Sequence, residues 1–506
     1  MNEECSYTAI TEAKDGSLIP LRKEIAFHSK YNPVREGQQF ASQCAGSPED
    51  TFFIILGICG AFHIEALRNA FPHSSILAVE KNQADLNFVK KLPLAEKLLQ
   101  DPRIILTSAE NLQEMLFTRF IPAEHSAIQL LSLRAWEQNF TDEARAIKEC
   151  VQKTLAAISA DFSVQSHFGG IWQRNIFVNL RQAADFNPSS MTFDRSKKAA
   201  VIAAGPSLDQ SVEELKKKRD AYVIIATDTA YRALLRHGIV SDVAVSVDAQ
   251  MISHAHFFEA KKESHFVLDL SANPATARTL SRQAPLHFVQ TGHPLSAYAS
   301  QLSKTPLASL QAGSGTVTIA AADFAIQAGF DELVFFGADF AYHQGKAYTS
   351  GTYLDDLYNT KSGRLKPAES FFDALLFRTP LIQKGEGVYS TEVLDSYRKS
   401  LDAFLTVNNF TKKADNTYIR TGKAEKAKAA GQASLLKTEA FNFTAFSQTY
   451  KKELRMSQDT GSRNSPLWLT LLPYIAWLRR IRGTAESFTE IVRQAYRKTL
   501  EYTELI

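Results

Sequence analysis

AAVIAAGPSLDQSVEELKKKRDAYVIIATDTAYRALLRHG, residues 199–238, is the stretch that decides the fold. The apolar runs 199–204 and 222–227 have the length of buried strands, and a segment with helical periodicity follows each of them, 211–220 and 229–238. Continuous apolar strands that alternate with amphipathic helices are typical of a parallel sheet covered on both faces. The sequence therefore predicts an α/β fold.

Further apolar runs extend this pattern along the chain. They lie at 243–247, 265–270, 286–290 and 332–336, so that residues 197–410 are predicted to form one module with a mostly parallel sheet. In such sheets, ligands bind outside the carboxyl ends of the strands. The residues that directly follow each strand are therefore the candidates for a site.

The first predicted group of site residues follows the first three strands and is assigned to nucleotide binding: Gly205, Pro206, Ser207, Leu208, Asp228 and Asp248. Gly205 lets the backbone approach a ligand, and the amides at 207–209 open a helix, which favours a bound phosphate. Two simpler interpretations stay open. Ser207 could only cap its helix, in a capping box with Gln210, and Asp228 could only be an N-cap.

A second predicted group lies further along the chain. It holds the turn before a helix, Gly313, Ser314, Gly315 and Thr316, and the end of the last strand, Gly337 and Asp339. The turn would give the crevice a second helix N-terminus and hence a second anion site. The carboxylates Asp228, Asp248 and Asp339 could orient hydroxyls, accept a proton or hold Mg²⁺, although no metal site is predicted. His254-Ala255-His256 has no third His or Cys ligand nearby and is predicted to be a solvated helix start.

Other structure is predicted on both sides of this module. Residues 1–165 form a Rossmann-like domain, in which TFFIILGICGAF (51–62) precedes Glu80, the last residue of the next strand. Since Gly57-x-x-Gly60 is not GxGxxG, a plain strand–helix turn and a nucleotide or S-adenosylmethionine site remain alternatives. Residues 166–196 hold a linking helix with Trp172, Ile176 and Leu180 on one face, and residues 411–506 are helical.

The bulk composition bounds the protein class. The 506 residues suggest more than one domain, and the net charge of +3 argues against a dedicated nucleic-acid-binding protein. The four cysteines form no CxxC pair, which fits reduced thiols. Without a readable signal peptide or an apolar run of about 20 residues, the protein is predicted to be cytoplasmic with no transmembrane segment. The sequence carries no indication of an oligomeric state.

Five motifs in order, GPSLD, ATDTA, SVDAQ, GSGTVTIAAADFA and FFGADFAY, resemble those of the motility-associated factor (Maf) glycosyltransferases. The central domain of that family is also called the 6-hydroxymethylpterin diphosphokinase MptE-like domain and is similar to bacterial sialyltransferases. HFGGIWQRN (167–175) and GICGAFHIEAL (57–67) resemble the preceding helix and the N-terminal domain of Maf proteins, so that the resemblance spans roughly residues 50–405.

The resemblance implies a glycosyltransferase that acts on flagellin and supports motility. It implies transfer of a nonulosonic acid, of the pseudaminic or legionaminic type, from a CMP-activated donor to flagellin Ser or Thr. Asp339, His343 and Asp248 are then the candidate catalytic residues, and Tyr342 and Tyr348 lie near the leaving phosphate. The loop 340–370 would be a lid or an acceptor platform, while the lysine-rich stretch 412–437 departs from the glycine-rich turn of the family. The alternatives are a pyrophosphokinase that uses ATP and a hydroxymethylpterin, and a flagellin-binding assembly factor without activity.

Overall fold

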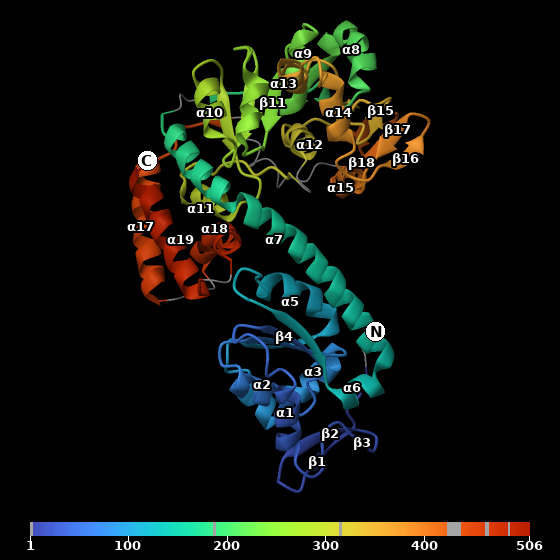
Figure 1. Cartoon of the computed structure of the whole chain (residues 1–506), viewed down its shortest axis with the longest axis vertical. Coiled ribbons are helices and arrows are strands. Elements are labelled where there is room, and N and C mark those ends of the chain that lie inside the picture. Colours follow the sequence, from blue (N-terminus) through green and yellow to red (C-terminus); the bar gives the residue numbers. More distant parts are fainter. Residues whose placement is uncertain are drawn as a thin grey trace. The chain divides into compact units, whose positions relative to one another are not determined.

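The computed structural model describes residues 4–185, 189–312, 316–422, 437–460, 465–483 and 486–505. The chain forms two compact units, Met1–His167 with Ile475–Ile491, and Phe168–Tyr474 with Val492–Ile506. The two are called unit 1 and unit 2 below. The predicted α/β class, with two Rossmann-like modules and a helical C-terminal region, is confirmed (Figure 1).

Unit 1 contains a four-stranded parallel sheet of order β6-β5-β4-β7 and a three-stranded sheet of order β1-β2-β3. The strands are β1 (Ala9–Glu12), β2 (Leu18–Arg22), β3 (Ile25–Ala26), β4 (Phe52–Leu56), β5 (Ser75–Glu80), β6 (Ile104–Ser108) and β7 (Ile128–Ser132). The helices are α1 (Pro33–Ser42), α2 (Phe62–Ala70), α3 (Gln83–Val89), α4 (Pro93–Leu98), η1 (Ala109–Asn111), α5 (Leu112–Arg119) and α6 (Arg134–Asn139). All five residues of β4 are buried, as expected for the central strand of a covered sheet.

Unit 2 is built around an eight-stranded sheet of order β13-β12-β11-β10-β9-β14-β19-β18. The strands from β13 to β14 are parallel, and β19 and β18 add an antiparallel edge. They are β9 (Lys198–Ile202), β10 (Tyr222–Thr227), β11 (Val243–Ser246), β12 (His265–Asp269), β13 (Leu286–Val289), β14 (Glu332–Phe336), β18 (Phe410–Ala414) and β19 (Thr417–Arg420). The smaller strands are β8 (Ser189–Ser190) with β20 (Lys437–Thr438), and β15 (Tyr342–His343), β16 (Ile382–Gly385) and β17 (Val388–Ser390).

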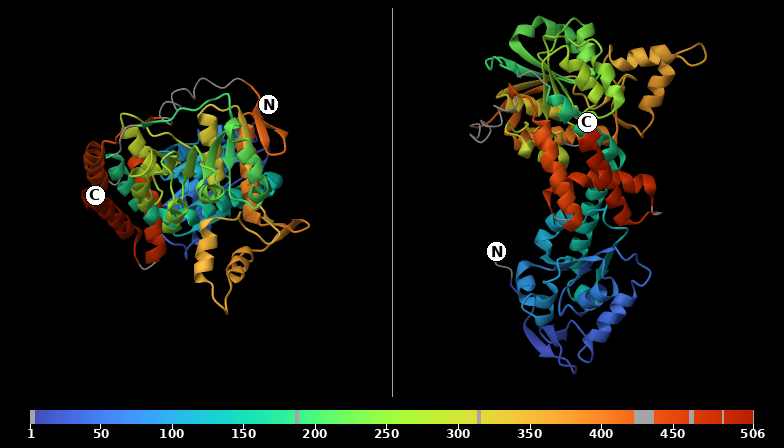
Figure 2. Two further views of the ribbon diagram at one scale, coloured as in Figure 1. Left: turned by 90° about the horizontal axis from the view of Figure 1, so that it is seen from above. Right: turned by 90° about the vertical axis from the view of Figure 1, so that its left-hand side faces the viewer.

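Helices connect or follow the strands of this sheet. They are α8 (Leu208–Lys217), η2 (Arg219–Ala221), α9 (Asp228–Arg236), η3 (Met251–Phe257), α10 (Pro274–Ser281), α11 (Pro294–Leu302), α12 (Val317–Gln327), α13 (Tyr353–Lys361), α14 (Ala368–Leu376) and α15 (Glu392–Val407). Val201, Ile225 and Val245 belong to one buried cluster together with the apolar residues of α12. Because side chains alternate along a strand, this cluster marks one face of the sheet, which α12 covers. Figure 2 shows the orange pair α13 and α14 projecting from the rest of unit 2.

Helix α7 (Thr141–Ala183) is 43 residues long and contains the first part of the predicted linker 166–196. The amide of its Asn175 donates to the carbonyls of Ala249 and Ser271, at 3.0 Å each. Ile176 and Leu180 are fully buried, and Phe177 packs against Tyr450 with ring centroids 5.9 Å apart. The helix therefore supports the loops that follow β11 and β12.

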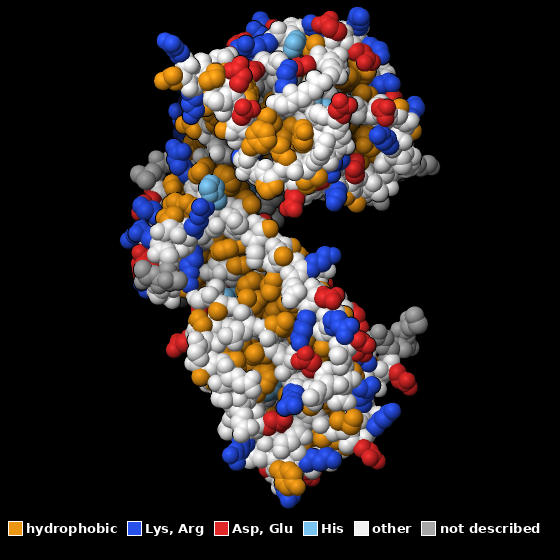
Figure 3. Space-filling model, turned by 45° about the vertical axis from the view of Figure 1, so that its right-hand side comes forward, with side chains coloured by type: hydrophobic (Ala, Val, Ile, Leu, Met, Phe, Trp, Pro, Cys, Tyr) orange, Lys and Arg blue, Asp and Glu red, His pale blue; other side chains and the backbone are white. Residues whose placement is uncertain are grey.

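The C-terminal region is helical from Phe443 onward, with α17 (Phe443–Thr460), α18 (Pro466–Arg482) and α19 (Phe488–Leu505), whereas the start of the predicted helical region 411–506 forms β18 and β19 of the main sheet. Within unit 2, the hydroxyls of Tyr450 and Thr470 lie 2.6 Å apart, and those of Ser457 and Tyr496 lie 2.8 Å apart. No helix in the described ranges is both long enough and apolar enough to cross a membrane. On the face drawn in Figure 3, acidic and basic side chains are interspersed.

Candidate functional site

The order of the strands places a crevice at the carboxyl ends of β9 and β14. The chain runs from β9 outward to β13 on one side and then returns to β14 on the other side of β9. Such a reversal is where open α/β sheets bind ligands, since the flanking connections diverge there. Most of the residues predicted from the sequence follow these strands.

A cleft of about 370 Å³ lies at this position in unit 2. Three groups of residues line it. Ala203, Ala204, Gly205, Thr227, Asp228 and Thr229 follow β9 and β10; Gly337, Ala338, Asp339, Phe340, Ala341, Tyr342, Ala347 and Tyr348 follow β14; and Thr316, Val317 and Thr318 open α12. The remaining wall comes from Leu375, Arg378, Thr379, Thr391, Val393, Leu394 and Tyr397.

The Gly-Pro-Ser turn does not offer the amides that the sequence suggested for a phosphate. The Ser207 amide donates to the Asp339 carboxylate at 2.8 Å, and the Ser207 hydroxyl donates to the other oxygen of that carboxylate. The amides of Leu208 and Asp209 donate to the carbonyls of Gly205 and Pro206 at 3.1 and 3.2 Å. These amides are engaged within the protein and the positive end of α8 holds Asp339 as its anion, so the phosphate-binding role of this turn stays a prediction.

Ser207 is the N-cap residue of α8, but the capping box that the sequence left open is not formed. The Ser207 side chain makes no capping bond to α8, because its hydroxyl is directed to Asp339. Gln210 donates its amide to the Ser207 carbonyl at 3.2 Å, so the expected capping box is not formed.

Gly205 is needed for the approach of two protein loops. A Cβ at this position would stand 2.4 Å from the Gly337 carbonyl oxygen and 2.5 Å from an Asp339 carboxylate oxygen. Gly337 in turn has φ +64°, and a Cβ there would stand 2.3 Å from the Ala203 carbonyl oxygen. The two glycines let the loops after β9 and β14 close on each other, and the Gly205 amide donates to the Gly337 carbonyl at 2.7 Å.

Asp209 anchors the loop that carries Tyr348. Its carboxylate accepts from the Thr349 hydroxyl, from the Ser350 amide at 2.9 Å and from Lys346 Nζ at 3.2 Å. Burial raises the pKa of Asp209, but these donors outweigh that effect and bring it below its ordinary value. The shape of this loop therefore depends on an ionised Asp209.

Asp228 follows β10 and is buried at the first position of α9, whose N-cap is Thr227. One carboxylate oxygen accepts from the Thr229 amide at 2.7 Å, and the other accepts from the Ser246 hydroxyl at 2.7 Å. Asp228 lines the cleft but is engaged on both oxygens, so it is not the N-cap that the sequence left open.

Asp248 and His256 lie beside Asp228, next to the residues that line the cleft. Burial, and then the charge of Asp228, raise the pKa of Asp248, which accepts from the Gln250 amide at 2.9 Å. His256 is 5% exposed, its ring packs edge-on against Tyr353 at 4.6 Å, and burial lowers its pKa against the opposing effect of the two carboxylates. The prediction of a solvated helix start is therefore wrong for His256.

His343 lies beside Asp339 but is not among the residues that line the cleft, whereas two nearby tyrosines line it. His343 Nε2 lies 4.0 Å from an Asp339 carboxylate oxygen, and the His343 side chain is 37% exposed in β15. Tyr342 and Tyr348 both line the cleft. Burial raises the pKa of Tyr348, and the nearby Arg378 charge opposes this rise.

The opening of α12 is only partly described. Gly313, Ser314 and Gly315 lie outside the described residues. Thr316 is the N-cap, and its hydroxyl accepts from the Thr318 amide at 3.3 Å. The first turn of α12 contains no acidic side chain, so its positive end faces the cleft without a carboxylate in that turn.

The sequence did not point to the wall formed by residues 375–397. Arg378 and Thr379 follow helix α14, Thr391 is the N-cap of α15 and Tyr397 lies within α15, whereas the strand-end rule selects residues that follow apolar strands. The sequence feature that could have indicated this wall is the pair of polar residues, Arg378 and Thr379, that follows the apolar helix α14. Among the residues that the structure describes, no three His, Cys, Asp or Glu side chains gather in a way that could hold a metal ion.

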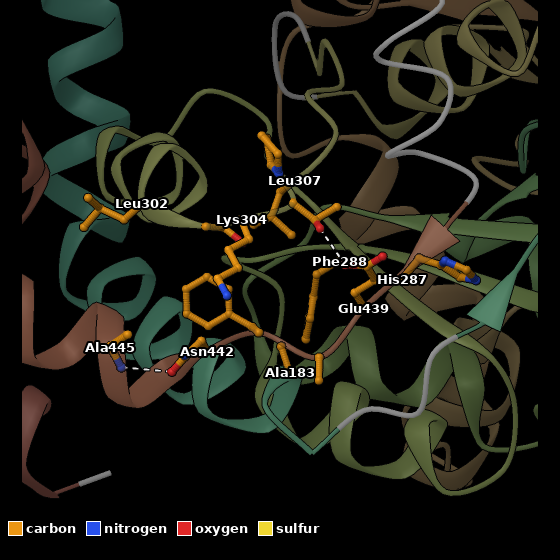
Figure 4. Close-up of a pocket in the computed structure, with 14 residues that line it drawn as sticks. Ala183, His287, Phe288, Leu302, Lys304, Leu307, Glu439, Asn442 and Ala445 are labelled. Carbon is orange, nitrogen blue, oxygen red and sulfur yellow. Dashed lines mark hydrogen bonds between the residues drawn. The ribbon is translucent and has the colours of Figure 1, made fainter.

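A second pocket of about 230 Å³ lies in unit 2, beside β13 (Figure 4). Phe288, Leu302 and Leu307 line it, and the Ala445 amide donates to the Asn442 side chain at its rim at 3.0 Å. It contains none of the predicted site residues. The cleft at the end of β9 and β14 is therefore the candidate active site.

The glycine turn of unit 1 is filled by the protein itself. The amides of Ile58 and Cys59 donate to Glu80 at 2.8 and 2.9 Å, and the Gly60 amide donates to His28 at 3.1 Å. Glu80 is fully buried and also accepts from Trp136 Nε1 at 3.0 Å. Of the two alternatives for this turn, the geometry favours the plain strand–helix turn.

A family profile described as 6-hydroxymethylpterin diphosphokinase MptE-like matches residues 174–345. An uncharacterized protein of Treponema pallidum (strain Nichols) is 36% identical over 136 residues, which are 27% of this chain and 65% of that relative. The chain thus spans a little under two thirds of this relative's length. Another uncharacterized protein of the same strain is 31% identical over 241 residues, 47% of this chain and 75% of that relative.

The fold is similar to that of a solved Maf glycosyltransferase from Magnetospirillum magneticum AMB-1. The TM-score is 0.54 at 15% identity, and the similarity covers 100% of this chain and 92% of that one. This likeness extends over both units.

Proposed function

Because this chain belongs to the MptE-like family and has the fold of a Maf glycosyltransferase, we propose that it is a glycosyltransferase. We propose that it transfers a nonulosonic acid of the pseudaminic or legionaminic type from a CMP-activated donor to Ser or Thr of flagellin, and so supports motility. The observation that carries this proposal is the cleft at the strand reversal, lined by polar residues from three strand ends.

The proposed roles follow from where the side chains stand. His343 takes the proton of the acceptor hydroxyl, and Asp339 stabilises the imidazolium from 4.0 Å away. The positive end of α12 stabilises the charge that develops on the departing phosphate, with Tyr342 and Tyr348 as hydrogen-bond donors nearby. Asp228 and Asp248 bind the nucleoside part of the donor.

We also propose that the reaction takes place in the cytoplasm. All four cysteines are free, and Cys44 and Cys59 are buried as thiols. Free thiols are typical of a reducing compartment.

Co-expression with flagellin and a nonulosonic-acid pathway tests the proposal. We expect a gain in the intact mass of flagellin with the wild-type protein and none with His343→Asn. His73→Asn is the matched control, because His73 is an exposed histidine of unit 1. An unchanged flagellin mass with the wild-type protein would contradict the proposal.

The description of the matching family supports a second candidate, a diphosphokinase that transfers diphosphate from ATP to a hydroxymethylpterin. That reaction releases AMP, whereas the glycosyltransferase releases CMP. Chromatography of the nucleotide products from both substrate pairs separates the two candidates. AMP release with the pterin, together with no CMP release from a CMP sugar, would favour the diphosphokinase.

A further inference from the structure

The cleft contains one basic side chain among its described lining residues, Arg378. It is an exposed residue two positions beyond the end of α14. Asp356 of α13, the helix before α14, pairs with Arg232 and with Arg236 of α9, the latter at 2.9 Å. The α13–α14 segment that precedes Arg378 is therefore tied to the sheet module through α13.

Arg378 has no acidic partner in the part of the chain that the structure describes. The two carboxylates that line the same cleft are engaged elsewhere, Asp339 with Ser207 and Asp228 with Thr229 and Ser246. An arginine has five N–H donors and stays charged at every physiological pH. Its donors are consequently available to a ligand.

The charge balance of the cleft shows which ligand gains from this arginine. An anionic group that enters meets two carboxylates, Asp228 and Asp339, and Arg378 is the side chain that offsets their repulsion. A neutral sugar or nucleoside would need no such offset. The guanidinium also matches phosphate oxygens with two parallel hydrogen bonds.

We propose that Arg378 recognises the phosphate of the nucleotide donor and so determines that the cleft binds a nucleotide rather than a nucleoside. This inference rests on the proposed function, since it assumes a nucleotide donor in this cleft. In this proposal the phosphate is bound by the Arg378 side chain and not by the amides of the Gly-Pro-Ser turn, which are engaged within the protein.

Calorimetric titration of CMP and of cytidine into the full chain tests the proposal. With Arg378→Met, CMP affinity should fall by about 10- to 100-fold, the range of one hydrogen-bonded contact to a charged group. Cytidine affinity and the melting temperature should stay unchanged. Arg378→Lys should give a smaller loss, since it keeps the charge without the paired donors.

Arg364→Met is the matched control, because Arg364 is an exposed arginine of the α13–α14 connection and does not line the cleft. It should bind CMP like the wild type. Sodium chloride should weaken CMP binding more in the wild type than in Arg378→Met, because salt screens the attraction between the Arg378 guanidinium and the CMP phosphate, which the variant lacks.

The outcomes separate this inference from the proposed function. If the wild type binds CMP and Arg378→Met binds it equally well, the inference is wrong and the proposed function stands. An equal loss for CMP and cytidine in Arg378→Met also overturns the inference, since the role would then be structural. If the wild type binds neither compound, the proposed nucleotide donor fails, and the inference fails with it.

Discussion

Replacing Gly205 by alanine should destabilise unit 2 strongly. The new Cβ would stand 2.4 Å from the Gly337 carbonyl oxygen and 2.5 Å from an Asp339 carboxylate oxygen. Since comfortable separations are about 3.5 Å, the loops after β9 and β14 must part by about 1 Å. That movement breaks the Gly205–Gly337 backbone hydrogen bond of 2.7 Å and pulls Asp339 away from the Ser207 amide.

The magnitude follows from these losses. Overpacking of this kind costs about 1–3 kcal/mol. A lost neutral hydrogen bond adds about 1 kcal/mol and a lost bond to a charged group about 1.5–3 kcal/mol. We expect Gly205→Ala to reduce the free energy of unfolding by about 3.5–7 kcal/mol, a large part of the stability of an ordinary domain.

Urea unfolding followed by circular dichroism measures this loss. Gly363→Ala is the control, because a Cβ at Gly363 meets no atom within 4 Å, and a change of at most about 0.5 kcal/mol is expected there. A Gly205→Ala protein that unfolds at the wild-type urea concentration, with unchanged slope, would refute the argument. If such a protein also failed to bind CMP, the glycine would serve the ligand, as the sequence alone suggested.

Three further predictions concern other parts of the chain. Burial holds the pKa of His293 at about 3, whereas the same side chain in the unfolded chain titrates near 6.5, so the free energy of unfolding at pH 5.5 should be about 1.4 kcal/mol lower than well above pH 6.5. His293→Asn keeps a capping acceptor on α11 and should reduce this loss of stability. Urea unfolding of both proteins at pH 5.5 and well above pH 6.5 measures it, and an equal loss in the two proteins would contradict the reasoning. Asp356→Ala frees α13 from Arg232 and Arg236, so trypsin should cleave the exposed connection 361–367 severalfold faster. An unchanged cleavage rate would show that these ion pairs do not hold α13 in place. Glu80→Gln turns an amide donor toward Trp136 Nε1 and should destabilise unit 1 by about 1–3 kcal/mol with unchanged CMP affinity in calorimetry; a parallel loss of CMP affinity would place a ligand in unit 1.

Local sequence patterns were sufficient for the sheet and for the edge at which the site lies. The apolar runs predicted the strands β9, β10 and β14, which the structure confirms. Because ligands bind outside the carboxyl ends of parallel strands, these strands then pointed to residues that line the cleft, such as Gly205 and Asp228. Both steps use information within about ten residues of each position, which is the range of periodicity arguments.

The partners of those residues could not be read in the same way. Ser207 meets Asp339 from 132 positions away, and no local pattern distinguishes an amide that faces a ligand from one that faces a distant carboxylate. His256 was predicted to be solvated because no third His or Cys ligand lies near it in the sequence, whereas in the fold it is buried beside Asp228 and Tyr353. Arg378 was missed because it belongs to a segment inserted after β14, where strand-end rules do not apply.

The division of the chain into units has a consequence for biosynthesis. Most of unit 1 precedes unit 2 in the chain, but unit 1 also includes Ile475–Ile491, and Arg479 donates to the Ser126 hydroxyl at 2.8 Å within it. Nascent chains usually fold domain by domain from the N-terminal side. Here unit 1 stays incomplete while all of the sheet module is translated, so unit 2 can close its β-sheet before unit 1 receives its last segment. A ribosome that stalls after residue 474 would leave unit 1 unfinished and exposed to chaperones and proteases, although most of it is translated before unit 2.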